Sequence, residues 1–174
     1  IPETQMTPTE LVAAAREFAP EAIKVSSPLP IRAAEVAQLP PSVRVIATVS
    51  VGTDHLDIPA ILGRGIALSN TPDVLTDCNA DLALMLILAA SRRAAEYRDL
   101  MKQGWGRGLA MDEMLGVRVT GKTLGIIGMG RIGRAVAQRA RGFGMKILYS
   151  NRRRLGAEDE HDAQYFATPE EMLP

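Results

Sequence analysis

The chain has 174 residues, 20 of them basic and 20 acidic, so its formal net charge is zero. This balance argues against a partner that is recruited by charge alone, such as nucleic acid or an acidic membrane. A single cysteine, Cys78, excludes an internal disulfide framework and a cysteine metal cluster, and the apolar run at residues 82–90 is too short to cross a bilayer. We expect a cytoplasmic protein without a metal, in which Cys78 is a small packing residue.

The first 75 residues alternate between predicted helices and strands. Helical patterns cover residues 9–18, 32–38 and 58–63, and apolar strand patterns cover residues 22–26, 43–49 and 65–69. Pro8 stands at the opening of the first helix, and a glycine-containing loop, residues 50–54, follows the second strand. This alternation predicts a parallel, doubly wound α/β unit with helices on both faces of the sheet.

The second half begins with one long predicted helix, from Thr76 to about Gln103, whose apolar face contains Leu82, Met85 and Leu86. The glycines at positions 104–108 end it, and a loop continues to residue 119. Strands at residues 123–127 and 145–150 then flank another helix. A polar loop at residues 158–162, a short strand at residues 165–166 and a helix capped by Thr168 and Glu171 complete the chain.

The most informative segment lies between residues 122 and 154. An apolar strand runs into Gly128-x-Gly130-x-x-Gly133, which opens an amphipathic helix, and a second apolar strand follows. In a dinucleotide-binding βαβ unit, Gly128 permits the tight turn, Gly130 lets the backbone approach a pyrophosphate, and Gly133 lets the helix pack on the strand. The pyrophosphate would bind to the free N–H groups and the positive dipole end of the new helix.

Basic residues follow the second strand of this unit. NAD-binding units place an acidic residue about 20 residues after the glycines, where it binds the adenine ribose. Asn151 stands there in this chain, followed by Arg152, Arg153 and Arg154. Guanidinium groups can bind the additional phosphate of NADP, which a carboxylate would repel. The alternative is a basic loop that only faces solvent; we predict NADP as the cofactor, in preference to NAD.

Three ordered motifs extend over most of the chain. They are Ser-Val-Gly-Thr-Asp-His-Leu-Asp at residues 50–57, Asn-Thr-Pro-Asp-Val-Leu-Thr-Asp at residues 70–77, and Gly-Lys-Thr-Leu-Gly-Ile-Ile-Gly-Met-Gly-Arg-Ile-Gly at residues 121–133. With these motifs the chain resembles the D-isomer-specific 2-hydroxyacid dehydrogenases, in the glyoxylate/hydroxypyruvate reductase branch. The resemblance implies two Rossmann-like α/β units: a flavodoxin-like portion of the substrate domain at residues 1–75, and the N-terminal half of the NAD(P)-binding domain at residues 76–174. It also implies reduction of a small 2-oxo acid, glyoxylate or hydroxypyruvate, for which the arginines after Asn151 predict NADPH, and a homodimer formed through the nucleotide domain.

The resemblance assigns roles to individual positions. The N–H groups of Val51 and Gly52 would bind the substrate carboxylate, which must be anchored while a hydride reaches the neighbouring carbon; a strand-ending turn without a binding role is the alternative. Asn79 would lie near the nicotinamide. The remaining cofactor-binding positions would follow the pyrophosphate and the adenosine: Gly128, Met129, Gly130, Arg131, Ile132, Gly133, Asn151, Arg152 and Arg153.

The resemblance assigns no catalytic residue to this chain. The family uses an Arg, a Glu and a His from the later half of its nucleotide domain, beyond residue 174. The two histidines here are His55, a structural position of the first motif, and His161, in the acidic loop. The family also has a strand before residue 1. We therefore expect an internal portion of an enzyme of about twice this length, inactive by itself.

Two other interpretations stay open. The chain could belong to a non-catalytic, dinucleotide-sensing module like the transcriptional corepressors that share this fold, and the sequence after residue 174 would decide. A different Rossmann enzyme, such as an adenosylhomocysteine hydrolase or a formate dehydrogenase, would share the glycine motif. It would not account for the motif at residues 50–55.

Overall fold

The computed structural model describes residues 6–173, and its contacts divide the chain into two compact units, Ile1–Leu75 and Thr76–Pro174. Each unit contains a three-stranded parallel sheet with flanking helices, so the predicted α/β fold class is confirmed. No helix in the described range is long and apolar enough to span a membrane.

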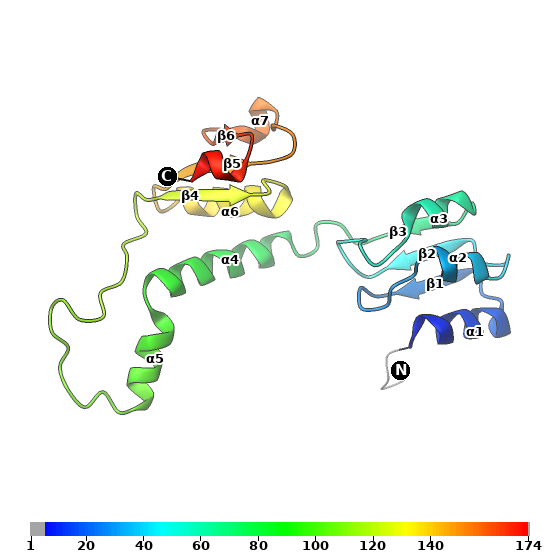
Figure 1. Ribbon diagram of the computed structural model, residues 1–174, viewed down its shortest axis with the longest axis horizontal. Helices are drawn as coiled ribbons and strands as arrows, with labels where there is room; N and C mark the ends of the chain where they lie inside the picture. The colour runs from blue at the N-terminus through cyan, green and yellow to red at the C-terminus, as the bar shows by residue number, and fades with distance from the viewer. Residues whose placement is uncertain (1–5, 174) are drawn as a thin grey trace. The chain divides into compact units, whose positions relative to one another are not determined.

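In the first unit, the strands β1 (Ala22–Val25), β2 (Val45–Thr48) and β3 (Ala67–Ser69) lie side by side in that order. Helices α1 (Pro8–Phe18), α2 (Ala33–Gln38) and α3 (Ile58–Gly63) alternate with them along the chain (Figure 1). α1 begins as predicted, because Pro8 occupies its first turn and Thr7 caps it. The six predicted elements of this unit are confirmed, with bounds that differ by at most two residues.

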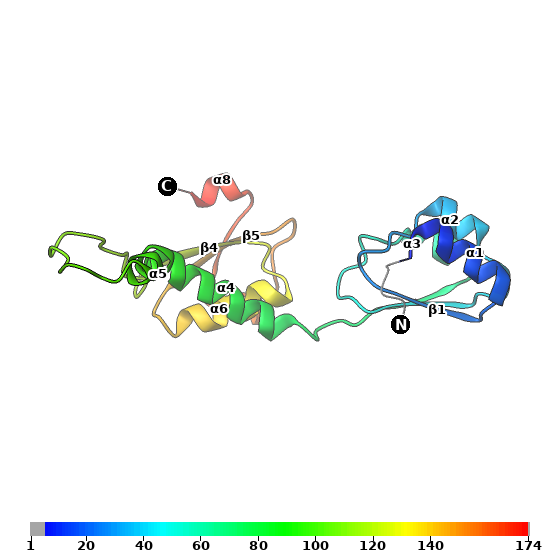
Figure 2. The ribbon, with the colours of Figure 1, turned by 90° about the horizontal axis from the view of Figure 1, so that it is seen from below.

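The described helices cover one face of this sheet. Along β1 and β2, the buried residues Ile23, Val25, Ile46 and Thr48 alternate with exposed or half-buried ones. Figure 2 shows the three helices on the same side of the strands. Ile31, Val36, Ile46 and Ile61 are the most deeply buried side chains of the core between helices and sheet. The expected second layer of helices is not found in the described part of this unit.

The second unit contains the strands β4 (Thr123–Ile127), β5 (Lys146–Ser150) and β6 (Gln164–Phe166), parallel and in that order. α6 (Arg131–Arg141) packs on β4 and β5, and α4 (Thr76–Ser91) packs on α6. α8 (Pro169–Met172) lies on the opposite face of the sheet (Figure 2). Its Met172 side chain packs against Gly125 of β4. The predicted strands and the predicted βαβ unit are confirmed.

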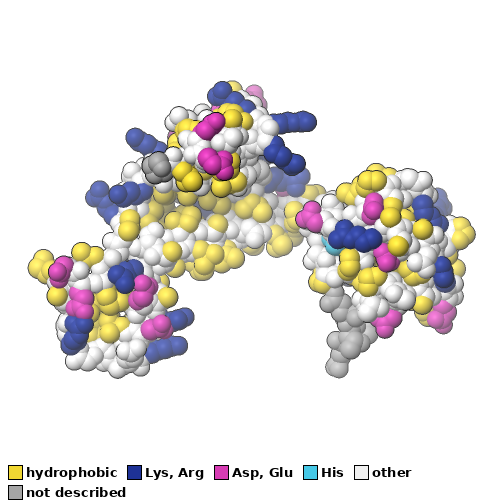
Figure 3. Space-filling view, in the orientation of Figure 1, with side chains coloured by type: hydrophobic (Ala, Val, Ile, Leu, Met, Phe, Trp, Pro, Cys, Tyr) yellow, Lys and Arg dark blue, Asp and Glu magenta, His cyan; other side chains and the backbone are white. Residues whose placement is uncertain are grey.

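The predicted single helix from Thr76 to about Gln103 is wrong. It is two helices, α4 and α5 (Ala94–Lys102), because Arg93 between them adopts a left-handed conformation with φ of 55°. The predicted apolar face of α4 is also not buried within the unit: Leu82, Met85 and Leu86 are 49%, 54% and 55% exposed. Figure 3 shows hydrophobic side chains gathered over this part of the molecule. Cys78 is exposed as well, so the expectation of a packing residue is wrong.

The polar loop expected at residues 158–162 is partly helical. α7 (Ala157–Glu160) forms one turn there, and Glu160 is buried. Downstream, Thr168 caps α8 as predicted by accepting a hydrogen bond from the Glu171 N–H at 3.3 Å. The Glu171 carboxylate accepts from the N–H of Ala167 rather than from that of Thr168.

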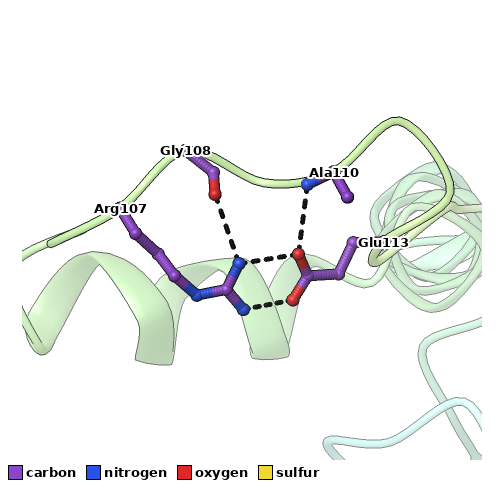
Figure 4. A network of polar contacts seen from close by, with 4 residues as sticks. All are labelled: Arg107, Gly108, Ala110 and Glu113. Atoms are coloured by element: carbon purple, nitrogen blue, oxygen red, sulfur yellow. Dashed lines mark hydrogen bonds and ion pairs between the residues drawn. The ribbon is translucent and has the colours of Figure 1, made fainter.

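α5 and the loop that follows it, residues 94–117, form an arm that is held by its own contacts. Arg107 binds Glu113 through both guanidinium Nη atoms and also donates to the Gly108 carbonyl, while the Ala110 N–H donates to Glu113 at 3.1 Å (Figure 4). Tyr97 stacks on Trp105 at a centroid distance of 6.3 Å. The predicted loop is thus an ordered structure with an exposed apolar surface that includes Met101, Trp105, Met111, Leu115 and Val117.

Candidate functional site

The three glycines of the motif have three different environments. Gly128 follows β4 with φ of 95°, a conformation that only glycine adopts readily. A Cβ on Gly133 would lie 2.4 Å from the carbonyl oxygen of Gly128, so α6 could not pack this closely on the turn with any other residue. A Cβ on Gly130 would meet nothing within 4 Å. Gly130 therefore borders open space, as a residue over which a ligand passes would.

A cleft of about 870 Å³ lies along the carboxyl ends of β4 and β5. Six of the predicted cofactor-binding residues line it: Gly128, Met129, Gly130, Asn151, Arg152 and Arg153. Ligands of open parallel α/β sheets bind at this edge, because loops and helix N-termini converge there. Its other lining residues are Ile127, Ser150, Leu155, Ala167 and Pro169, so none of the described residues around the cleft is acidic.

The first turn of α6 offers free donors at this cleft. Gly130 is the N-cap of the helix and provides no side chain to cap it. Among the described residues, the N–H groups of Gly130, Ile132 and Gly133 have no hydrogen-bond acceptor. Uncapped amides and the helix dipole together favour an anion at this end. Arg131, the remaining predicted residue of this turn, lines a neighbouring cavity of about 740 Å³.

Two hydrogen bonds connect the glycine turn to the end of β5. The Asn151 Oδ1 accepts a hydrogen bond from the Met129 N–H at 2.7 Å, and the Gly128 N–H donates to the Ser150 carbonyl at 3.0 Å. The Met129 side chain is buried in the core of the unit. Met129 can therefore face a ligand in the cleft only through its backbone, and the Asn151 side chain turns towards the glycine turn.

Arg152 and Arg153 are the exposed cations of the cleft, and neither has a partner among the described residues. Arg154, which is not among the predicted cofactor-binding residues, differs from them. Its Nε and Nη2 atoms bind the two Glu160 carboxylate oxygens at 2.9 and 2.8 Å, and its guanidinium lies 5.8 Å from the Tyr165 ring centroid. Two arginines, and not three, are available to a ligand phosphate.

In the Ser50–Asp54 loop of the first unit, backbone carbonyl groups accept hydrogen bonds, whereas two adjacent N–H groups remain without an acceptor in the described part of the chain. The Ser50 carbonyl accepts from the Thr71 N–H, and the Val51 carbonyl accepts from the Asn70 Nδ2, each at 3.0 Å. The Gly52 carbonyl accepts from the Ser50 hydroxyl at 2.7 Å. The N–H groups of Val51 and Gly52, the predicted carboxylate donors, have no acceptor among the described residues. Free adjacent amides suit a carboxylate.

Comparison with known proteins identifies the family. Residues 84–174, more than half of the chain, match the family described as "D-isomer specific 2-hydroxyacid dehydrogenase, NAD binding domain". The chain belongs to this family. The predicted family is therefore confirmed, and the glycine turn, α6 and the two arginines lie in the segment that matches its NAD-binding domain.

Curated relatives extend the match of this chain into the first unit. It is 46% identical over 143 residues to a glyoxylate reductase of Thermococcus kodakarensis, covering 80% of the chain and 43% of the relative. It is 45% identical over 134 residues to a glyoxylate/hydroxypyruvate reductase B of Erwinia tasmaniensis, covering 76% and 42%. The chain thus spans less than half the length of these relatives.

Solved dehydrogenase structures show the same fold. A glyoxylate reductase from Paecilomyes thermophila superimposes with a TM-score of 0.82 at 35% sequence identity, over 93% of this chain and 51% of that one. Both α/β units of this chain therefore have the fold of a solved member of the family.

The two histidines are placed as expected. His55 is buried, and its Nε2 lies 2.9 Å from the Thr48 hydroxyl, which is a structural contact. His161 is exposed at the end of α7. Asn79, expected near the nicotinamide, lies exposed in the first turn of α4 and is not among the lining residues of the glycine cleft.

Glu160 is the residue that sequence reasoning missed. Besides Arg154, it accepts a hydrogen bond from the fully buried Tyr149 hydroxyl at 2.7 Å, and that hydroxyl accepts from the Leu155 N–H. The Arg154 guanidinium, and next the Tyr149 hydroxyl, hold the pKa of Glu160 below its ordinary value, whereas burial raises the pKa of Tyr149. This network fixes the segment on which Arg152 and Arg153 stand. The run of acidic residues at positions 158–162 hid it, because such runs usually face solvent.

Proposed function

We propose that this chain is part of an NADPH-dependent reductase of small 2-oxo acids, such as glyoxylate or hydroxypyruvate. One observation carries the cofactor choice: the cleft beside the glycine turn has two unpaired arginines, Arg152 and Arg153, and no acidic residue among those that line it. An acidic residue at this place would repel the phosphate that distinguishes NADP from NAD.

The two units divide the binding in this proposal. Residues 76–174 form the first half of the nucleotide domain, in which the turn at residues 128–130 and the first turn of α6 hold the pyrophosphate, and Asn151 to Arg153 hold the adenosine end. Residues 1–75 form a portion of the substrate domain, in which the amides of Val51 and Gly52 bind the substrate carboxylate. The bound nicotinamide would supply the hydride, and these residues bind and orient the reactants. Asn79 is proposed to contact the nicotinamide end.

The proton for the new hydroxyl group comes from outside residues 1–174 in this proposal. His55 donates or accepts within the buried contact to Thr48, and His161 stands on an exposed turn. Neither histidine lies among the residues around the glycine cleft. We expect residues 1–174 alone to bind the cofactor without turnover. Measurable reduction of glyoxylate by this chain alone would contradict this assignment.

The experiment that tests the cofactor assignment is a fluorescence titration with NADPH and with NADH. The wild-type protein should bind NADPH more tightly, and Arg152→Asp should shift the ratio of the two dissociation constants towards NADH by about tenfold, since a charge-assisted contact is worth about 1.5–3 kcal/mol. Arg118→Asp is the matched control, because Arg118 is also exposed but is not a lining residue of the cleft. An unchanged ratio in Arg152→Asp would refute the phosphate-binding role.

We also propose that the nucleotide domain pairs with a second copy of itself. A monomer would leave in water both the exposed face of α4 (Leu82, Met85, Leu86) and the apolar side chains of the arm. The arm is held in shape by its own contacts between Arg107 and Glu113 and between Tyr97 and Trp105, so it is pre-organised to meet a partner. In a two-fold symmetric homodimer, the same surface is buried on both copies, and such symmetric dimers are the commonest assemblies of soluble proteins.

A further inference from the structure

A chain of three polar side chains lies behind the Ser50–Asp54 loop. The His55 Nε2 is 2.9 Å from the Thr48 Oγ1, and the Thr48 Oγ1 is 2.8 Å from the Ser50 Oγ. The Ser50 Oγ in turn is 2.7 Å from the Gly52 carbonyl oxygen. Thr48 and His55 are both buried, at 2% and 8% exposure, so these contacts compete little with water.

The direction of each hydrogen bond in this series of side chains follows from the Gly52 carbonyl at its end. A carbonyl oxygen can only accept, so the Ser50 hydroxyl donates to Gly52. A hydroxyl has one proton, so Ser50 must accept from Thr48, and Thr48 must then accept from His55. His55 therefore carries a proton on Nε2. All donors point the same way, from the buried imidazole to the loop.

Because a peptide unit is planar, a hydrogen bond that holds its carbonyl group also orients its N–H group. In a trans peptide, the C=O of one residue and the N–H of the next point in opposite directions. The held carbonyls of Ser50 and Val51 thus aim the N–H groups of Val51 and Gly52 away from Asn70 and Thr71. By the same geometry, the Ser50 bond to the Gly52 carbonyl determines where the N–H of Thr53 points. That N–H also has no acceptor among the described residues.

We propose that the Thr53 N–H is a third donor to the substrate carboxylate, and that His55, Thr48 and Ser50 are positioning residues that hold it in place. This inference rests on the proposed function, in which Val51 and Gly52 bind that carboxylate. A carboxylate has two oxygens with several lone pairs, so it can accept three amides. Ser50 and Thr48 act through the Gly52 peptide and touch no substrate.

The test follows the three amides separately. In the ¹⁵N-labelled full-length gene product with NADP⁺ bound, oxalate serves as the carboxylate probe and the amide shifts of Val51, Gly52 and Thr53 are recorded. The wild type should show saturable shifts of all three. Thr48→Val, which keeps the side-chain shape but removes the hydroxyl, should lose the Thr53 response and keep those of Val51 and Gly52. Thr48→Ser, which restores the hydroxyl, should recover it.

Steady-state kinetics of the same variants give the second readout. Thr48→Val should raise the KM for glyoxylate about tenfold, the loss of one well-oriented donor to a charged group, with kcat within about twofold and an unchanged Kd for NADPH. Thr48→Ser should return KM to the wild-type value. A merely structural role of Thr48 would instead impair kcat, KM and stability together in both variants, and would overturn the proposal.

The outcomes distinguish the proposed role of Thr53 from the proposed carboxylate site at Val51 and Gly52. If oxalate shifts Val51 and Gly52 but never Thr53, the third donor is refuted and the proposed carboxylate site stands. If oxalate shifts none of the three amides, the carboxylate site itself is refuted, and the proposal falls with it.

Discussion

Two glycines of the same turn should separate folding from cofactor binding when each is replaced by alanine. At Gly133, a Cβ would lie 2.4 Å from the Gly128 carbonyl oxygen and 3.3 Å from the Ile126 Cγ2. At Gly130, whose φ is −81°, a Cβ would meet nothing within 4 Å. Gly133→Ala should therefore destabilise the unit, and Gly130→Ala should leave it folded but block the approach of the pyrophosphate.

The size of the first effect follows from the contact. Ordinary contact begins at 3.4 Å, so α6 would have to move about 1 Å away from a backbone atom that cannot yield. Overpacking of this kind costs about 1–3 kcal/mol, and an obstacle made of backbone places Gly133→Ala near the upper value. The better helix propensity of alanine returns about 1 kcal/mol. The net loss is about 2 kcal/mol, or a fall in Tm of roughly 10 °C for a unit of this size.

The second effect has the opposite pattern. Gly130→Ala introduces no clash, and it reduces the freedom of the unfolded chain, which stabilises by about 0.4–1 kcal/mol where the backbone conformation is compatible. Its methyl group would occupy the open side of the turn, so the Kd for NADPH should rise at least about tenfold, which corresponds to about 1.4 kcal/mol.

The assay combines urea unfolding, monitored by circular dichroism, with NADPH titration of the folded variants. The reasoning about packing would be refuted by a Gly133→Ala protein as stable as the wild type. Wild-type NADPH affinity in Gly130→Ala would show that the dinucleotide does not pass over this turn.

Three further outcomes are expected. Glu160→Gln should lower the free energy of unfolding, because Arg154 and the Tyr149 hydroxyl lose their charged partner, although Arg154 can rehydrate. Because the pKa of Glu160 is lowered in the folded protein, Glu160 stabilises the fold fully above about pH 4.3, the ordinary glutamate value, and this stabilisation is lost as pH falls through the folded pKa. The free energy of unfolding of Glu160→Gln should therefore depend less on pH in acid than that of the wild type, and an identical pH dependence would count against the network. The Arg107 guanidinium lowers the pKa of Glu113 to about 2, so Arg107→Ala should return that pKa towards its ordinary value in an NMR titration, and an unmoved titration would show that the pair in the arm does not form. Met85→Glu should convert the proposed dimer to monomer in sedimentation velocity, and an unchanged sedimentation coefficient would place the interface elsewhere.

Much of the fold was predictable from the sequence because local rules decide it. Strand and helix periodicity, the proline and threonine at the start of α1, and the spacing of the glycines each act within a few residues, and the structure places these elements as expected. The turn at Gly128 is a further example, since its φ of 95° is a property of one residue. The missed break at Arg93 lacks such a signal, because an arginine in a left-handed conformation leaves no mark in composition.

Tertiary structure alone decided the roles of residues whose partners lie far along the chain or outside it. The sequence shows three equal arginines after β5, but only the packing of α7 on Tyr149 brings Glu160 to Arg154 and leaves two of them free. It shows an apolar face on α4, but not that this face stays uncovered within the unit. It shows the Ser-Val-Gly-Thr-Asp-His motif, but not the aligned donors from His55 to Gly52. Backbone conformation follows from neighbours in sequence, whereas burial and pairing follow from neighbours in space.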